Sequence, residues 1–237
     1  MSYMPYSAYG RRESAAMTGV VAKFMSAVYA WMAVGLATTA IVAWFMASRP
    51  DLIFSMYNSG LIWILLIAEI AIAVTIGNAT QRIGAGMATL LFGVYAALNG
   101  VTLSVLLLMY TTASLGAAFG VTAGTFGVMS LIGFTTKRDL TQLGSLLMMA
   151  LVGVIIASVV NIFVASTALH WIVTYVALFV FIGLTAYDTQ KLKGVAYATE
   201  GNEAMASRFA VVGSLILYLD FINIFILLLR VMGDRRN

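Results

Sequence analysis

The chain has 237 residues, of which 62% are hydrophobic and 9% are charged, and its mean hydropathy is +1.00. Soluble globular domains carry about 25% charged residues, so the composition excludes an ordinary soluble domain and predicts an all-α membrane protein with several spans. The net charge of +4 indicates membrane topology rather than a nucleic-acid partner, because the basic residues stand at the ends of apolar segments. The chain has no cysteine, which excludes disulfides and thiolate metal sites.

The predicted elements begin with a short cytoplasmic tail over residues 1–24, which is polar and rich in tyrosine. After this tail, seven apolar segments are long enough, at about 20 residues each, to cross a bilayer. We expect them to form a seven-helix transmembrane domain over residues 25–230, followed by a short basic tail over residues 231–237. The seven segments cover residues 25–47, 61–78, 86–110, 115–134, 145–165, 171–187 and 211–229.

Two further features describe the regions within and between these spans. Residues 189–210, between the sixth and seventh spans, carry five charged residues and are predicted to form the one long loop. In the fourth span Gly116, Gly120 and Gly124 recur every four residues and predict a face along which a neighbouring helix packs closely.

The distribution of lysine and arginine predicts a cytoplasmic amino terminus. With that orientation nine basic residues lie inside and four lie outside, as the positive-inside rule requires. The carboxy-terminal tail then lies outside, against the same rule; if the last segment is instead a re-entrant hairpin, the tail returns to the cytoplasm. The inner residues are Arg11, Arg12, Lys23, Arg82, Lys137, Arg138, Lys191, Lys193 and Arg208, and the outer ones are Arg49, Arg230, Arg235 and Arg236.

Asp220 stands near the middle of the last apolar segment. A carboxylate at that depth costs a few kcal/mol unless it is protonated, paired or facing water. Asn223 lies one turn further on, so the two polar side chains share a helix face. That face must turn toward protein or a water-filled cavity, and we therefore predict that the last span is the central helix around which the other six pack.

Two more carboxylates lie in or at the edge of the spans, Glu69 in the second and Asp188 at the end of the sixth. Asp188 is either an ordinary interfacial acid or a partner for Asp220. If the two aspartates meet, both cannot ionise cheaply, and they would share a proton that links the two helices. Glu69 needs a polar partner on another helix or a lumen. Arg82 is either a topology determinant or a counter-ion to Asp188.

The segments 183–191 (GLTAYDTQK) and 217–225 (LYLDFINIF) resemble the carboxy-terminal signature of the Bax inhibitor (TMBIM, or lifeguard) family. The resemblance implies six helices around a central seventh, a bacterial inner-membrane location and a pH-sensitive calcium leak. It also implies that Asp188 and Asp220 are the paired aspartates of the family, which gate the pathway and contact the cation, and that Arg82 is the basic residue that latches onto one of them.

With this resemblance, we expect Asp188, Asp220, Arg82, Glu69 and Asn223 to form a cation leak pathway. No cofactor is expected beyond calcium as a permeant or bound ion. The alternative is a non-conducting regulator that binds another membrane protein, such as a membrane-anchored protease. An intramembrane aspartyl protease is less consistent with the sequence, because such enzymes need glycines before the second aspartate and this chain has Leu217, Tyr218 and Leu219 there. His170, which begins the sixth span, is interpreted as an interfacial residue or, less simply, as a pH sensor.

Overall fold

The computed structural model describes residues 6–78 and 84–236, with side chains from residue 19 onward. Within these ranges the chain is helical and forms no β-strand, as expected for an all-α membrane protein. The helices are α1 (Tyr6–Ala47), α2 (Pro50–Asn58), α3 (Leu61–Asn78), α4 (Ala85–Met109), α5 (Thr112–Thr135), α6 (Thr141–Val164), α7 (Thr167–Ala198) and α8 (Glu203–Met232). Arg82 lies outside the described residues.

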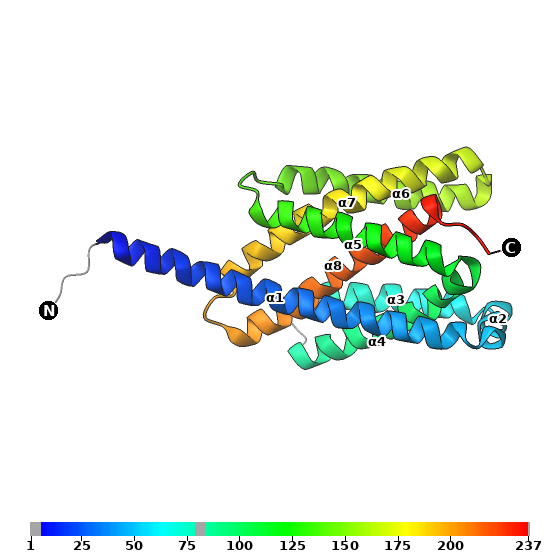
Figure 1. The fold of residues 1–237 in the computed structure, drawn as a ribbon, viewed down its shortest axis with the longest axis horizontal. Coiled ribbons are helices and arrows are strands. Elements are labelled where there is room, and N and C mark those ends of the chain that lie inside the picture. Colours follow the sequence, from blue (N-terminus) through cyan, green and yellow to red (C-terminus); the bar gives the residue numbers. More distant parts are fainter. Residues whose placement is uncertain (1–5, 79–83, 237) are drawn as a thin grey trace.

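Each of the seven apolar segments lies in a helix, namely α1 and α3 to α8. Within the described residues, six helices are long and apolar enough to cross a membrane, and there are seven if α2 and α3 are counted together as one bent span. Helix α2 meets α3 at an angle of 87°, and the turn between them contains Gly60 with φ of 74°, a conformation that favours glycine. Helix α1 begins at one end of the long axis and α8 ends toward the other (Figure 1), as expected for an odd number of spans.

Helix α8 is the most buried of the candidate spans. It packs against α1, α3, α4, α5 and α7, and in Figure 1 it runs through the middle of the bundle. Among its fully buried side chains are Leu217, Tyr218 and Ile224. The expected central carboxy-terminal helix is therefore confirmed.

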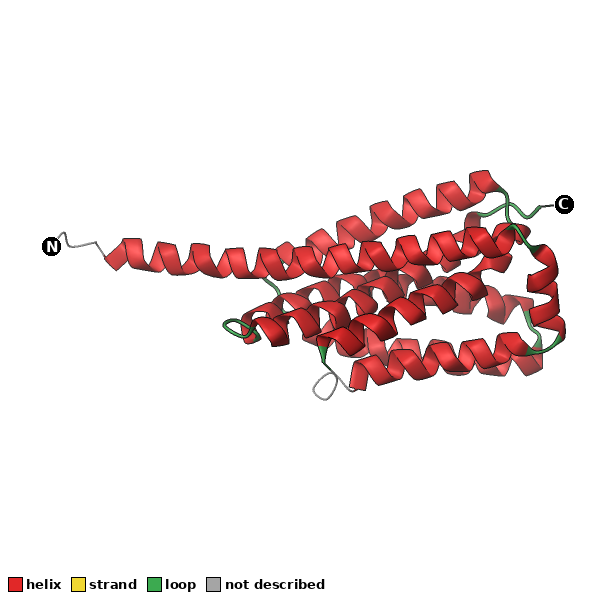
Figure 2. Ribbon diagram, turned by 90° about the horizontal axis from the view of Figure 1, so that it is seen from below, coloured by secondary structure: helices red, strands yellow, loops and turns green. Residues whose placement is uncertain are grey.

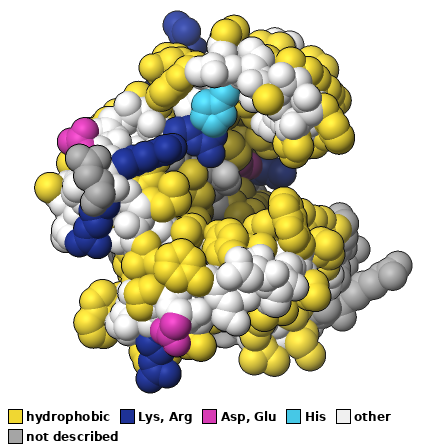
Figure 3. Space-filling view, turned by 90° about the vertical axis from the view of Figure 1, so that its right-hand side faces the viewer, with side chains coloured by type: hydrophobic (Ala, Val, Ile, Leu, Met, Phe, Trp, Pro, Cys, Tyr) yellow, Lys and Arg dark blue, Asp and Glu magenta, His cyan; other side chains and the backbone are white. Residues whose placement is uncertain are grey.

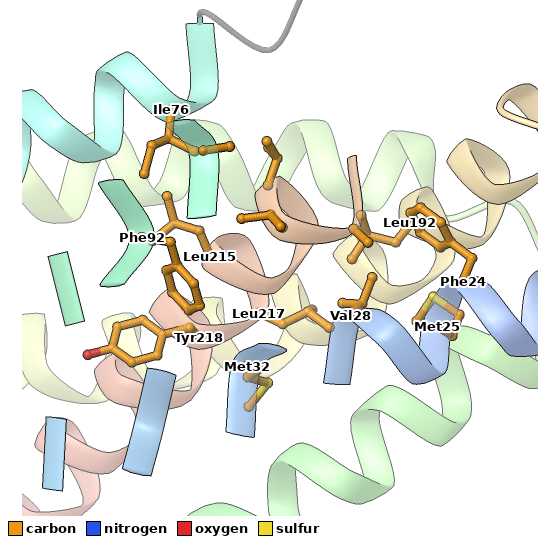
Figure 4. Packing of buried hydrophobic residues seen from close by; sticks show 14 of the residues in the cluster. Phe24, Met25, Val28, Met32, Ile76, Phe92, Leu192, Leu215, Leu217 and Tyr218 are labelled. Atoms are coloured by element: carbon orange, nitrogen blue, oxygen red, sulfur yellow. The ribbon is translucent and has the colours of Figure 1, made fainter. Parts of the chain in front are cut away.

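The largest cluster of buried apolar residues joins α8 to α1, α3, α4, α5 and α7. Figure 4 shows Leu217 of α8 beside Val28 and Met32 of α1, and Tyr218 beside Phe92 of α4. In a bilayer, association of helices depends on close packing, because lipid is as apolar as the side chains. This cluster therefore fixes α8 by shape and contact rather than by exclusion of apolar groups from water.

The region predicted to be a long loop is mostly helix, which corrects that expectation. Helix α7 continues to Ala198 and α8 begins at Glu203, so only residues 199–202 connect them. Asn202 caps α8 by accepting a hydrogen bond from the Met205 amide at 2.9 Å. The charged residues of this region extend both helices beyond their apolar segments instead of breaking them. Helix α1 likewise begins at Tyr6, within the predicted tail of residues 1–24, and it continues without a break past Met25. Its first part extends beyond the bundle (Figure 2).

The predicted glycine face of α5 does not pack against another described helix. A Cβ atom at Gly116, Gly120 or Gly124 would meet no atom within 4 Å. The face that does pack carries Ser114, Ala118, Thr122, Phe126, Ser130 and Gly133. The expectation was wrong because two sets of small residues recur every four positions on this helix, and the sequence does not indicate which set faces the bundle.

Gly133 and Gly124 provide a matched test of this orientation. A Cβ at Gly133 would overlap the backbone carbonyl of Ala186 on α7, so Gly133→Ala should destabilise the protein by about 1–3 kcal/mol through overpacking. Gly124→Ala meets open space and should be neutral. Thermal unfolding in one detergent measures both, and equal midpoints for the two variants would contradict the packing of α5 described here.

Candidate functional site

The two aspartates predicted to pair line one cavity. It has a volume of about 670 Å³ and lies between α6, α7 and α8. Helix α6 packs against α7 and is separated from α8 by this space, which makes α6 the outermost helix of the bundle. The cavity lining is mainly apolar, and its polar members are Ser158, Thr174, Tyr187, Asp188, Lys191, Asp220, Asn223 and Arg230.

Asp220 is the most buried ionisable group of this cavity. Its side chain is 4% exposed, and its Oδ2 atom has no hydrogen-bond partner among the described residues. The helix holds it there because Leu217, Phe221 and Ile224 on the neighbouring faces of α8 are packed into the core. A buried carboxylate oxygen without a donor is costly, so this atom is available to a proton or a cation.

Asp188 reaches the same cavity from α7 and is half-buried. Lys191 lies one turn further along α7 and lines the same cavity. The Nζ atom of Lys191 is 5.9 Å from the centre of the Tyr187 ring. The structure therefore brings Asp188 and Asp220 together, because α8 begins eight residues before its apolar segment and so passes beside the end of α7.

Asn223 also lines the cavity. Its Nδ2 atom donates to the Leu219 carbonyl of its own helix at 2.8 Å, which leaves the amide oxygen as the group it offers to a cation. Among the described residues no three histidine, cysteine, aspartate or glutamate side chains are grouped as a metal site. Calcium takes 6–8 oxygen ligands in proteins, so two aspartates and an asparagine suit a cation in transit better than a resident metal ion.

Glu69 occupies a different site on the other side of α8. It is 6% exposed, as expected for a carboxylate that faces protein rather than lipid. Asn99 Nδ2 donates to its Oε2 atom at 3.2 Å and Thr102 Oγ1 donates to its Oε1 atom at 3.0 Å. Both donors are on α4, so Glu69 ties α3 to α4.

This polar network continues from α4 to α8 and α1. The Tyr218 hydroxyl donates to Asn99 Oδ1 at 3.0 Å, and it lies 2.6 Å from Thr39 Oγ1. Thr39 in turn donates to the Ala96 carbonyl at 2.8 Å. Two hydroxyl protons thus serve three contacts, so one of the three contacts lacks a proton in any arrangement of the network.

Tyr218 and Asp220 are two residues apart on α8, which places them about 200° apart around the helix axis. The Glu69 network and the aspartate cavity therefore lie on opposite sides of the central helix. Glu69 is not among the residues that line the aspartate cavity. The structure brings together Asp188, Asp220 and Asn223 of the predicted pathway and separates Glu69 from them.

Sequence reasoning missed four participants in these two sites. Lys191 and Arg230 line the aspartate cavity, and Asn99 and Tyr218 complete the Glu69 network. Lys191 could have been found from its spacing of three from Asp188 on one helix. A polar group inside a span needs a partner, and this rule was applied only to the carboxylates. Applied to side-chain amides as well, it would have identified Asn99.

The fold and these two sites define a polytopic all-α membrane protein with ionisable groups on both sides of a buried central helix. Residues 21–237 match the family described as inhibitor of apoptosis-promoting Bax1, and the chain belongs to this family. The inner membrane protein YbhL of Escherichia coli K12 is 46% identical over 215 residues, which cover 90% of this chain and 92% of YbhL. An uncharacterised protein of Deinococcus radiodurans is 43% identical over 91% of this chain and 92% of its own length. The similarity to YbhL and the apolar helices indicate a multi-pass inner-membrane protein.

The Glu69 network should contribute to stability through Tyr218. Tyr218→Phe removes the hydroxyl that contacts Asn99 and Thr39, and it should lower the free energy of unfolding by about 1–3 kcal/mol, because a buried acceptor loses its donor. Tyr175→Phe is the control, since Tyr175 is 45% exposed. Both variants are compared by thermal unfolding in the same detergent, and an unchanged midpoint for Tyr218→Phe would show that the network does not hold α8.

Proposed function

We propose that the protein is a pH-sensitive cation leak pathway, with calcium as a permeant ion, and that Asp188 and Asp220 gate it. The observation that carries this proposal is that both carboxylates line one cavity of about 670 Å³, in which Asp220 has an oxygen without a donor among the described residues. Isolated carboxylates persist inside membrane proteins where an ion or proton pathway needs them.

The extent of the cavity supports a pathway rather than a closed pocket. Along α7 its lining runs from Val173 to Lys191, which is about 27 Å at 1.5 Å per residue. The hydrocarbon core of a bilayer is about 30 Å thick. Asp188 lies near one end of this length and Arg230 near the other, with Asp220 and Asn223 between them along α8.

Protonation controls this pathway through repulsion between the two carboxylates. One shared proton lets Asp188 and Asp220 lie close and holds α7 against α8, whereas loss of that proton sets two negative charges against each other. The helices then separate or take up a cation between the carboxylates. Lys191, one turn from Asp188 on α7, is the positive group beside this pair, and it limits the repulsion, whereas Arg230 lies at the other end of the cavity.

Calcium flux into dye-loaded liposomes should therefore rise with pH, from mildly acidic to mildly alkaline. Asp188→Asn and Asp220→Asn should each remove this dependence, because either change leaves a single ionisable carboxylate. Asp51→Asn, on the exposed helix α2, is the matched control and should keep the parent profile. If either aspartate variant folds and its calcium flux keeps the parent's pH midpoint and slope, the two aspartates do not act as one gate and have separate roles.

The orientation proposed for this pathway places the α7–α8 connection and the amino terminus in the cytoplasm. The cysteine-free chain allows a direct measurement with single cysteines. Glu200→Cys, in that connection, should not react with an impermeant maleimide added to intact cells, whereas Ser59→Cys, beside α2 at the opposite end, should react. Reversed labelling would place the amino terminus outside.

A non-conducting regulator is the second candidate function, and the exposed glycines of α5 favour it. Gly116, Gly120 and Gly124 leave open space along one helix face, which a helix of another membrane protein, such as a membrane-anchored protease, could approach closely. Absence of flux at every pH from folded parent protein would favour this function. Proteolysis is disfavoured, because Leu217 and Leu219 stand before Asp220 at the positions where intramembrane aspartyl proteases need glycine.

A further inference from the structure

A second, smaller cavity gathers basic side chains at the end of the bundle where the carboxy terminus lies. It has a volume of about 200 Å³, and His170, Arg230 and Arg235 line it together with five apolar or aromatic residues. Figure 3 looks onto this end and shows the histidine and basic side chains around a hollow. No carboxylate of the described residues lies within 4.0 Å of these three groups.

The chain builds this cavity by folding its tail back onto the bundle. The Asp234 amide donates to Ser114 Oγ at 2.9 Å, the Thr111 amide donates to the Asp234 carbonyl at 3.2 Å, and the Arg236 amide donates to the Met109 carbonyl at 2.8 Å. These bonds pin the backbone on both sides of Arg235. Arg235 therefore stands at a fixed place beside the cavity rather than on a free terminus.

The donors of the two other groups remain available. Arg230 Nη1 has one contact, a long one of 3.5 Å to Thr174 Oγ1, although a guanidinium carries five N–H donors. His170 lies in the first turn of α7, where the helix dipole adds positive potential. Three groups that donate to anions thus converge on one space without an anion among the described residues.

The depth of the cavity is indicated by the aromatic residues beside His170. Trp171 stacks on Tyr175, with ring centres 5.9 Å apart, and its ring lies 6.0 Å from that of His170. Tryptophan and tyrosine gather where the hydrocarbon meets the head groups. The cavity therefore lies at the level of lipid phosphates and also faces the aqueous phase.

We propose that His170, Arg230 and Arg235 form a binding site for a phosphate group at this membrane surface. A guanidinium matches phosphate oxygens with two parallel N–H donors, and the imidazole supplies a third direction of contact. The phosphate comes from the head group of an anionic lipid or from inorganic phosphate in solution, and the chemistry of recognition is the same for both.

The site also regulates the cation pathway, a consequence that rests on the proposed function. Arg230 lines both this cavity and the aspartate cavity. Its positive charge at the mouth opposes entry of a cation, and a bound phosphate offsets that charge. Occupied protein should therefore pass calcium faster than empty protein.

Binding is measured on the full-length purified protein without reference to flux. Native mass spectrometry with phosphatidylglycerol and with phosphatidylcholine gives the lipid arm, and calorimetric titration with inorganic phosphate gives the soluble arm. Arg230→Gln and Arg235→Gln should each weaken binding at least about tenfold, since each removes a charged hydrogen-bond donor. Arg49→Gln is the control, because Arg49 lies between α1 and α2 and contacts Phe45 instead of the cavity.

If the parent protein retains phosphatidylglycerol in preference to phosphatidylcholine, and both arginine variants lose this preference, the site binds a lipid head group. If the parent shows no lipid preference but binds inorganic phosphate, and both variants bind it more weakly, the site binds a soluble anion. Binding of both ligands that is equal in Arg230→Gln, Arg235→Gln and Arg49→Gln overturns the proposal. Arg235 is outside the helical core, so its variant keeps the test valid if Arg230→Gln does not fold. Specific binding without any calcium flux would retain the site and reject the cation pathway.

Discussion

The structure depends on the burial of a few polar side chains of an otherwise apolar central helix inside a membrane. Every polar side chain of α8 must find a partner within the bundle or face a cavity, because lipid offers none. Tyr218 and Asp220 meet this requirement in different ways. Tyr218 is bonded to two neighbouring helices through Asn99 and Thr39, whereas Asp220 keeps an oxygen without a donor among the described residues. The buried polar group on one side of α8 thus has its hydrogen-bond partners, and the one on the other side lacks a donor for one oxygen.

Packing follows the same division. On the Tyr218 side, α1 and α4 approach so closely that a Cβ at Gly100 would lie 2.7 Å from the Thr39 carbonyl. On the Asp220 side, α6 is separated from α8 by the cavity and packs on α7. Separation of helices on the Tyr218 side would break several hydrogen bonds. On the Asp220 side α7 is also held, by hydrogen bonds from Thr189 to Ser130 and from Lys193 to the Phe134 carbonyl, so the looser contact is the one between α6 and α8. A change in charge at the aspartates therefore acts beside the gap between α6 and α8.

Much of the fold could be predicted from the sequence, because an apolar segment of about 20 residues has few alternatives in a bilayer. The central position of α8 followed from a single fact, the depth of Asp220. Helix ends were harder, because residues 189–210 are polar by composition and helical by continuation of α7 and α8. The glycine face of α5 was misjudged because small residues indicate close approach without saying which helix approaches. The separation of Glu69 from the aspartates depends on side chains from three other helices. The sequence alone does not indicate in which order those helices are arranged around α8.

The carboxy-terminal tail explains the exception to the charge rule that the sequence presented. Arg230, Arg235 and Arg236 lie on the side where basic residues are disfavoured if the amino terminus is cytoplasmic. A tail without contacts to the rest of the protein would not be stabilised by that charge. Here three backbone hydrogen bonds hold the tail against α4 and α5, and they place Arg235 beside Arg230 and His170 around one cavity. Positive charge fixed in this way lies at one end of the cavity that contains the two aspartates and raises the electrostatic potential there. The exception to the topology rule is therefore consistent with an electrostatic role for these residues rather than an error in the orientation.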